Sequence, residues 1–268
     1  MKNAHIEKNL GKAYYMRSAN PQNLDAPVSK SLLWDFHQSP YKWRHSTGKE
    51  VTKAMDLGTL IHSAILEPII PLNEVAVVSP YPDFRTKAAQ EWRDDQRAMG
   101  KMIATDEDIR IASGCEQVFS EDYAERFGVD YSTEVAVFAE IGATKIKGMI
   151  DIVPDGLDLL VDLKTTSLIG TTFNIMQNIL KWGYHWQAAL YLDLWNAASG
   201  DNRNRFVFCF IEPKEPYETA WVELSPAFIE LGRAGYMNAL AQWQSCVSTD
   251  HWPKQHEGIS VIEKPAYL

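Results

Sequence analysis

Cysteine is scarce in this sequence, which has three residues of this type, Cys115, Cys209 and Cys246, scattered along 268 positions. An odd and widely spaced set provides neither a disulfide framework nor a zinc site. An iron–sulfur cluster normally takes four cysteine ligands, so that cofactor is excluded as well. We therefore expect three buried or inert thiols.

Long apolar runs are also missing. No stretch approaches the length that crosses a bilayer, and the first residues, MKNAHIEKNLGK, lack the apolar core of a secretory signal. We therefore expect a cytoplasmic protein without a membrane partner.

Common catalytic motifs are absent too. The sequence contains no GxSxG, no P-loop and no HExxH, which removes the commonest hydrolases and ATPases. It also contains no internal repeat and no low-complexity linker.

Positive charge is in deficit, since the net charge is −9. This balance counts against a protein that coats nucleic acid nonspecifically. It does not exclude an enzyme that acts on DNA, because carboxylates that hold metal ions add negative charge. Several basic residues are close to one another in the sequence, and they would form either a local groove for DNA or solvated surface faces. They are Lys145, Lys147, Lys164, Lys181, Arg203 and Arg205.

The first half of the chain is typical of helices after a polar arm. Residues 1–27 are predicted to be irregular, since they are polar and interrupted by prolines. Ser29 or Ser31 is a good N-cap for a helix that Pro40 ends. Further helices are predicted at 57–66 and, as one or two polar-faced segments, over 84–127.

The second half is typical of a sheet. Short apolar runs at 133–140, 145–153 and 157–163 predict an antiparallel meander, with a proline–glycine turn at 154–156. Helices at 171–182 and 184–198, strands at 205–211 and 219–224, and a closing helix at 226–246 follow. The order predicts an α/β fold with a mixed central sheet flanked by helices. We expect a single domain over 28–268, with a helical part (28–130), a sheet core (131–225) and a closing helix and tail (226–268).

The strongest chemical signal is Gly148-Met-Ile-Asp151, followed eleven residues later by Asp162-Leu163-Lys164. Alternate side chains of a strand point the same way, so Asp162 and Lys164 share a face and Leu163 packs on the other. The hairpin would bring Asp151 beside Asp162. Two carboxylates suit Mg²⁺, which polarises a phosphodiester and activates water, while the lysine stabilises developing charge.

The competing interpretation is a surface salt bridge between Asp162 and Lys164, with Asp151 as a turn carboxylate. The residues around the pair are almost all apolar. Charged side chains in such a strand are costly unless they are paired or bind a metal. The context therefore favours a metal site.

Four other residues are candidates for the same site. Glu134 opens the first strand and supplies a third carboxylate, unless it is an exposed strand end. Gln187 and Tyr191 are four apart on one helix face and both can hydrogen-bond a phosphate or a metal-bound water, although a tyrosine there is also typical of the core. His62 lies on a mostly apolar helix, where it is either a core residue or a group that completes a metal shell.

These pieces together resemble a known family. Val28-Ser-Lys-Ser-Leu, Leu57-Gly-Thr-Leu-Ile-His62, Leu66-Glu-Pro68 and the motifs above are similar to the exonuclease VIII (RecE) group. That group belongs to the PD-(D/E)XK nucleases, which have a restriction-endonuclease-like core and include the RecB nuclease domain. The resemblance extends from about Val28 to Trp252.

The resemblance implies roles for individual residues. Asp151, Asp162 and the backbone carbonyl of Leu163 would bind metal, with His62 at or near it. Lys164 would be the catalytic lysine. Glu134 corresponds to an acidic residue before the metal carboxylates, and Gln187 and Tyr191 would lie beside the scissile phosphate.

The resemblance also implies an activity and partners. Members degrade linear duplex DNA in the 5′-to-3′ direction with Mg²⁺, for which Mn²⁺ would substitute. They leave 3′ single-stranded tails for a RecT-type annealing protein, and they form ring-shaped homo-oligomers. A phage or prophage origin would place the protein in a bacterial host cell.

Two departures from related nucleases are informative. Ser39-Pro40 stands where a cluster-bearing branch has Cys-Pro, which agrees with the lack of an iron–sulfur site. We also expect the nuclease domain alone, without the large amino-terminal extension of some members. Arg85 and Lys87 loosely resemble a basic stretch of the group and, with Lys147 and Lys181, are the candidate DNA contacts.

Two other functions compete with the exonuclease. One is a CRISPR-associated or structure-specific endonuclease on the same fold, which would cut circular DNA. The other is a catalytically silent DNA-binding protein. The complete set of Asp151, Asp162 and Lys164 argues against the second, because a silent copy has no physical reason to keep a buried charged strand.

Overall fold

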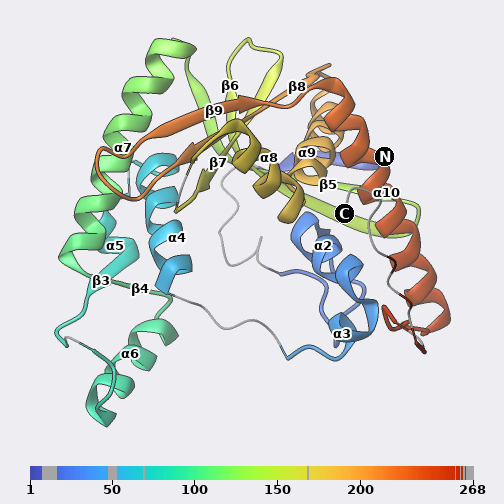
Figure 1. Cartoon of the computed structure of the whole chain (residues 1–268), viewed down its shortest axis with the longest axis horizontal. Coiled ribbons are helices and arrows are strands. Elements are labelled where there is room, and N and C mark those ends of the chain that lie inside the picture. Colours follow the sequence, from blue (N-terminus) through green and yellow to red (C-terminus); the bar gives the residue numbers. More distant parts are fainter. Residues whose placement is uncertain are drawn as a thin grey trace.

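A mixed sheet forms the centre of the molecule (Figure 1). The computed structural model describes residues 1–7, 17–47, 53–68, 70–81, 83–167, 169–256, 258–259, 261 and 263. Within these residues the sheet has seven strands in the order β1-β5-β6-β7-β8-β9, and β2 pairs with β6. The strands are β1 Lys2–Glu7, β2 Val28–Ser29, β5 Tyr131–Ile141, β6 Thr144–Pro154, β7 Leu159–Thr165, β8 Arg205–Ile211 and β9 Thr219–Glu223.

The strand directions confirm a mixed sheet. β5, β6 and β7 form the predicted antiparallel meander, whereas β7 and β8 run parallel and β8 and β9 antiparallel. The parallel step is possible because two helices lie between β7 and β8 in the chain. They are α8 (Thr172–Lys181) and α9 (Tyr184–Ser199).

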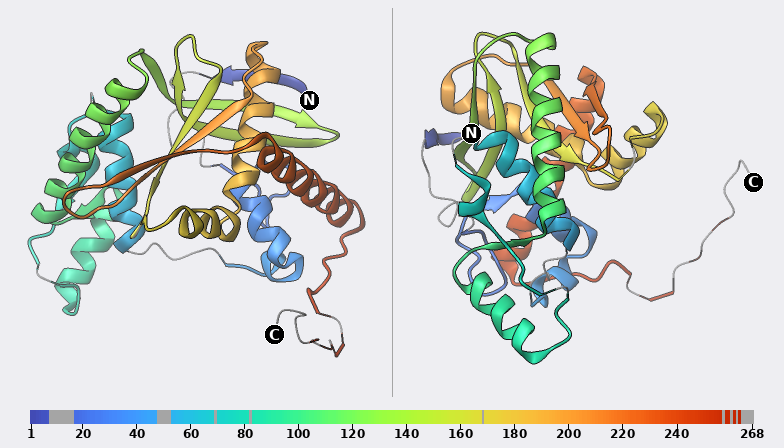
Figure 2. Two further views of the ribbon diagram at one scale, coloured as in Figure 1. Left: turned by 45° about the horizontal axis from the view of Figure 1, so that its top comes forward. Right: turned by 90° about the vertical axis from the view of Figure 1, so that its left-hand side faces the viewer.

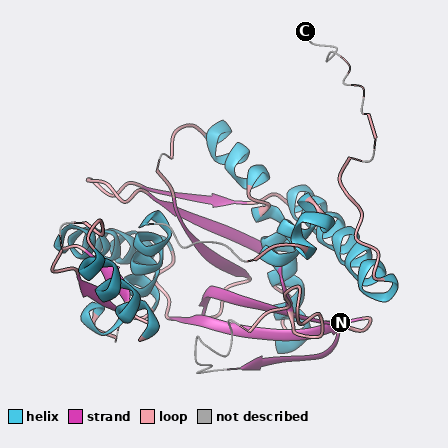
Figure 3. Cartoon of the chain, turned by 90° about the horizontal axis from the view of Figure 1, so that it is seen from below, coloured by secondary structure: helices cyan, strands magenta, loops and turns pink. Residues whose placement is uncertain are grey.

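Helices cover both faces of the sheet (Figure 3). A cluster that we call the α9-side core joins α2, α9 and α10 to β5 and β6, and the α7-side core joins α4 and α7 to β7 and β8. The remaining helices and a small two-stranded sheet, β3-β4, complete the described fold. Their bounds are α2 Lys30–Gln38, α3 Pro40–Arg44, α4 Lys53–Leu66, α5 Leu72–Val75, β3 Ala76–Val78, α6 Lys87–Ala98, β4 Met102–Ala104, α7 Asp106–Arg126 and α10 Pro226–Thr249.

Side-chain caps fix where the helices begin. Ser29 Oγ accepts a hydrogen bond from Leu32 N–H and starts α2, as the sequence predicted. Ser39 ends α2 and caps α3, which begins at Pro40. The predicted segment 84–127 forms two helices, α6 and α7, separated by β4.

The prediction of an irregular arm over 1–27 is wrong at its start, where Lys2–Glu7 form β1 on the edge of the sheet. This strand is mostly polar and shows no clear alternation, so its pattern gave no signal. It forms because its backbone pairs with the free edge of β5, and Ala4 and Ile6 pack against the α9-side core.

The structure bears on two expectations from the composition, which concern the cysteines and membrane-crossing segments. All three cysteines are free and buried, as predicted. Among the described helices, none combines the length and the apolar character that a membrane-crossing segment needs.

Candidate active site at the fork between β6 and β7

Two carboxylates meet where β6 and β7 separate. The strands pair at Ile152 and Val161, and the next residues in that antiparallel register are Asp151 and Asp162. Asp151 Oδ2 accepts a hydrogen bond from the backbone N–H of Leu163 at 2.9 Å. The side chain of Asp151 therefore takes the place of a strand carbonyl, and the hairpin brings the two acids together as predicted.

Asp162 is almost completely buried, with 1% of its surface exposed. Its Oδ1 accepts a hydrogen bond from Gln187 Nε2, and its Oδ2 forms an ion pair with Lys164 Nζ. Leu163 packs in the α7-side core, so the predicted division of the strand into a charged and an apolar face is confirmed.

The two acids shift each other's ionisation. Burial raises the pKa of Asp151 to about 6. Burial also raises the pKa of Asp162 to about 7, and the neighbouring charge of Asp151 adds to this effect. Burial lowers the pKa of Lys164, but the charges of Asp162 and Asp151 outweigh it, so that pKa lies above its ordinary value.

These residues fit a divalent cation. One ammonium faces two buried carboxyls, and burial raises the pKa of both acids, so a cation would supply positive charge that would favour both carboxylates in their ionised form. Within the described residues, no group of three or more acidic, histidine or cysteine side chains has metal-ligand geometry. Mg²⁺ does not require one, since it is often held by one or two carboxylates with water and substrate phosphates.

Glu134 and His62 lie beside Asp151. Glu134 is opposite Asp151 on β5, between the pairs Thr133–Ile152 and Val135–Ile150, and its charge raises the pKa of Asp151. Its φ of 49° is strained for a side chain of this type. His62 Nδ1 lies 4.0 Å from Asp151 Oδ2, which is close to the acid but beyond a hydrogen bond.

The chain matches the family model of a PDDEXK-like domain of unknown function (DUF3799) over residues 29–265. The chain belongs to this family. The match covers most of the sequence and includes every element that builds the fork. The fold class predicted from the sequence, a PD-(D/E)XK core with a mixed sheet, is thereby confirmed.

Solved structures support the same fold. The crystal structure of a protein named "Putative exonuclease" from Eubacterium rectale aligns with a TM-score of 0.64 at 14% identity, over 97% of this chain and 96% of the other. A phage-related exonuclease from Haemophilus somnus gives 0.38 at 13% identity (86% and 99% coverage), and an alkaline exonuclease from Laribacter hongkongensis gives 0.31 at 14% (70% and 94%). Only the first of these similarities has a TM-score high enough to support the fold. At these sequence identities none of them establishes an activity. No curated protein matches the chain.

In this PDDEXK-like domain, the Tyr184 ring contacts Lys164, and this contact was not predicted from the sequence. Lys164 Nζ lies 4.9 Å from the centroid of the Tyr184 ring and 5.9 Å from that of Phe208. Such contacts attract a cation to the ring face. Tyr184 is three residues before Gln187 on α9, so the helical repeat offered a signal that the two side chains share a face.

The two predicted helix residues lie in different surroundings. Gln187 contacts Asp162, whereas the ring of Tyr191 packs in the α9-side core against Gly148. A Cβ at Gly148 would lie 2.9 Å from Tyr191 Cε1, so only glycine lets α9 approach β6 this closely. The contact of Tyr191 with a phosphate remains a prediction.

The candidate DNA contacts are not gathered in one groove. Arg85 and Lys87 are exposed beside α6 and pair with Asp83 and Glu91. Lys147 is buried and donates a hydrogen bond to the carbonyl of Arg17 at 2.9 Å. Burial lowers its pKa to about 8.

The other basic residues of the expected groove are also dispersed. Arg203 is buried and donates to the carbonyls of Pro154 and Leu159, so it holds the chain ahead of β7. Arg205 pairs with Glu223 and Asp158. Lys181 is exposed at the end of α8, and its contact with DNA remains a prediction.

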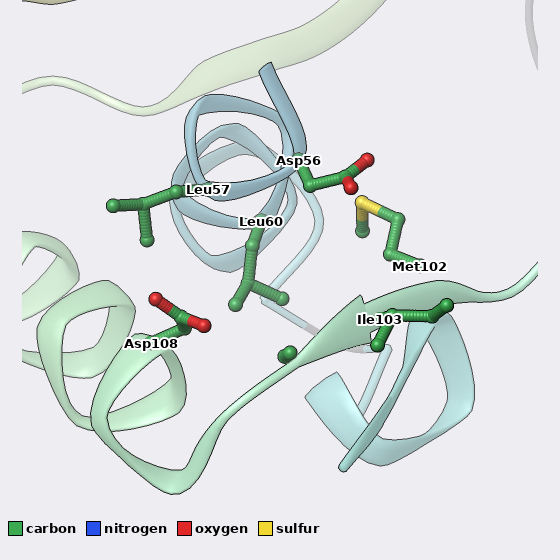
Figure 4. A pocket seen from close by; sticks show the side chains of 7 residues that line it. Asp56, Leu57, Leu60, Met102, Ile103 and Asp108 are labelled. Atoms are coloured by element: carbon green, nitrogen blue, oxygen red, sulfur yellow. The ribbon is translucent and has the colours of Figure 1, made fainter. Parts of the chain in front are cut away.

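A small cavity lies apart from these groups, between α4, β4 and α7 (Figure 4). Its volume is about 10 Å³, which is room for about one water molecule. The two acids at its wall already have partners, since Asp108 belongs to the capping box of α7 and Asp56 pairs with Arg97. The cavity is therefore a packing feature and has no role in the chemistry.

Proposed function

We propose that this domain is a Mg²⁺-dependent exodeoxyribonuclease that degrades linear duplex DNA from its ends. The observation that carries the proposal is the buried meeting of Asp151, Asp162 and Lys164 at the fork between β6 and β7. Hydrolysis of a phosphodiester needs a cation site, an activated water and a positive group near the phosphate, and these side chains supply such a set.

Asp151 and Asp162 would hold the metal, together with the backbone carbonyl of Leu163. His62, next to Asp151, would bind a water of the metal shell. When bound, Mg²⁺ or Mn²⁺ would polarise the phosphodiester and lower the pKa of a water molecule.

The other residues position these groups. Lys164 would orient the attacking water or stabilise charge that develops on the phosphate. Gln187 fixes the orientation of the Asp162 carboxylate through its hydrogen bond to Oδ1, while Oδ2 faces Lys164. Glu134 would contribute negative charge near the attacking water, from its strained position opposite Asp151.

The choice of an exonuclease is supported by the name of the Eubacterium rectale protein and by the resemblance of the motifs to exonuclease VIII. That resemblance also carries the 5′-to-3′ direction, the 3′ single-stranded product, the ring-shaped homo-oligomer and the annealing partner of the RecT type. We propose these properties for this chain on the same basis.

Digestion of linear duplex DNA labelled at either 5′ or 3′ end, beside nicked and closed circles, tests the proposal. We expect loss of the 5′-labelled strand from linear DNA in Mg²⁺, no digestion in EDTA, and an intact closed circle. Cleavage of the closed circle would identify an endonuclease instead. Binding without cleavage of any substrate would identify a silent DNA-binding protein.

Substitutions at the fork test which residues carry the reaction. We expect Asp162→Ala and Lys164→Ala to reduce the cleavage rate by at least about 100-fold, the order of effect of removing one preorganised group, while DNA binding persists. Asp158→Ala removes an exposed acid from the turn between β6 and β7 and serves as the control. Near-normal cleavage by either fork variant would refute its assigned role.

A further inference from the structure

Trp182 is a large aromatic side chain that the fold leaves in solvent. It caps the C-terminus of α8, and 50% of its surface is exposed. The ammonium of Lys181 lies 5.0 Å from the centroid of the indole ring. An exposed aromatic face next to a cation is the combination with which proteins bind single-stranded nucleic acid, since bases stack on the ring and the cation contacts the phosphate.

The backbone that carries this indole is held firmly. The carbonyl of Trp182 accepts a hydrogen bond of 2.5 Å from Lys30 Nζ, and its N–H donates to the carbonyl of Asn178 at 3.0 Å. Gly183 follows in a left-handed conformation with φ 63° and packs so closely on Trp34 that a Cβ would lie 2.3 Å from Trp34 Cε3. These contacts therefore fix the backbone from which the exposed ring projects.

The same contacts connect the indole to the candidate active site. Lys30 is buried, and its ammonium lies 5.4 Å from the centroid of the Tyr184 ring. The Lys164 ammonium lies 4.9 Å from the centroid of the same ring. Trp182 thus projects from a turn whose next helix begins with the tyrosine that contacts the catalytic lysine. In the view of Figure 1, α8 appears between α4 and α2, and the right-hand view of Figure 2 shows that it projects from the molecule beyond both helices.

We propose that the Trp182 indole is a stacking platform for one unpaired nucleobase of the strand that is cut, and that Lys181 contacts the backbone phosphate beside it. This inference rests on the proposed nuclease function and names the part of the substrate that the site would recognise. Duplex DNA hides the faces of its bases within the stack, so the ligand is a frayed or single-stranded end. Stacking of this kind tolerates any base, which suits an enzyme that moves along a sequence.

The alternative occupant of an exposed aromatic ring is a second copy of the chain. The neighbouring cation argues against it, because Lys181 beside Trp182 makes the patch complementary to a phosphate and unlike the apolar centre of a stable protein interface. Continuity with the catalytic lysine through Tyr184 also favours substrate.

Binding of a labelled single-stranded oligonucleotide, measured by fluorescence anisotropy with Ca²⁺ in place of Mg²⁺, tests the platform. We expect Trp182→Ala to weaken binding by about 5- to 100-fold, the range measured for the loss of one stacked base, and Trp182→Phe to remain within about threefold of wild type. Phe173→Ala is the matched control. This aromatic is equally open, with 63% of its surface exposed, but it lies nine residues earlier on α8 and so about half a turn around the helix.

A second arm is read first on the wild-type protein, so its main result does not depend on the folding of a variant. An abasic nucleotide is moved one position at a time along the oligonucleotide. We expect a loss of affinity at one or two positions near the end, and we expect the Trp182→Ala protein to show no further loss there.

Three outcomes would overturn the inference: normal binding by Trp182→Ala, equal tolerance of an abasic nucleotide at every position, or a change in oligomeric state of Trp182→Ala in analytical ultracentrifugation. The last would show that a second copy covers the ring. Failure of wild-type protein to cleave linear duplex DNA in Mg²⁺ would instead refute the proposed function, and this outcome is distinguishable because it is read without any variant.

Discussion

At the scale of single residues, the negative charge of Asp151 lowers the free energy of unfolding of the metal-free protein. Its carboxyl is buried next to Asp162, and both pKa values lie above their ordinary range. We expect Asp151→Asn to stabilise the metal-free protein at pH 8 by roughly 1–3 kcal/mol, because the amide keeps an acceptor for Leu163 N–H and removes a buried like charge. Urea unfolding in EDTA measures the difference. A destabilised variant would show that the charge of Asp151 supports the fold.

The same pair predicts how stability depends on pH. Because the folded-state pKa values are raised to about 6 and about 7, the folded metal-free protein binds more protons than the unfolded chain between about pH 4 and pH 7. Its stability relative to an Asp151→Asn/Asp162→Asn variant should therefore fall as the pH rises through this window and stay constant above it. Denaturant unfolding of both proteins from pH 4.5 to 8.5 tests this, and a constant difference would contradict it.

Tyr184 is a positioning residue for Lys164. We expect Tyr184→Phe to keep most of the activity, since the ring face remains, and Tyr184→Leu to lose about 3- to 30-fold in kcat, the range of one partly buried cation–π contact. A structural role alone would affect stability and leave the pH profile unmoved. We therefore expect the basic limb of the rate profile to shift to lower pH in the leucine variant, and an unshifted limb would argue against a contact between ring and ammonium.

At the scale of elements, α9 and the hairpin of β6 and β7 form one unit. Gly148 lets Tyr191 and Leu194 pack directly on β6, and the same helix delivers Gln187 to Asp162. We expect Gly148→Ala to cost about 1–3 kcal/mol of stability and to lower the cleavage rate, because the helix must move to accept the methyl group. Combining it with Tyr191→Leu should restore part of both losses. If the double variant is no more stable and no more active than Gly148→Ala alone, the contact between residue 148 and Tyr191 does not cause the losses.

Much of this arrangement was predictable because its signals are local. The proline–glycine turn and the alternation along Asp162-Leu163-Lys164 predicted the hairpin, the shared face and the meeting with Asp151. Local patterns gave no signal for β1, which is polar and depends on the free edge of β5. They also gave none for the left-handed backbone of Glu134.

At the scale of the whole molecule, the parts that escaped prediction are contacts between distant segments. Lys30 and the Trp182 carbonyl are 152 positions apart in the sequence, and the fold brings them together with Tyr184 at the end of β7. The expected basic groove depended on closeness in the sequence alone, and the fold instead buries Lys147 and Arg203 and leaves Lys181 at the end of α8.

The overall charge of −9 is consistent with this picture. The basic residues of the expected groove are dispersed within the described part of the chain, and few phosphate contacts give weak DNA binding.

Binding of a divalent ion at the fork is the physical requirement of the entire mechanism. Calorimetric titration of Mn²⁺ into the metal-free protein without DNA measures it directly, beside Asp151→Asn/Asp162→Asn and the control Asp158→Asn. We expect saturable binding by the wild-type and control proteins and its loss in the double variant. Equal binding by all three proteins, or by none, would contradict a metal site formed by Asp151 and Asp162.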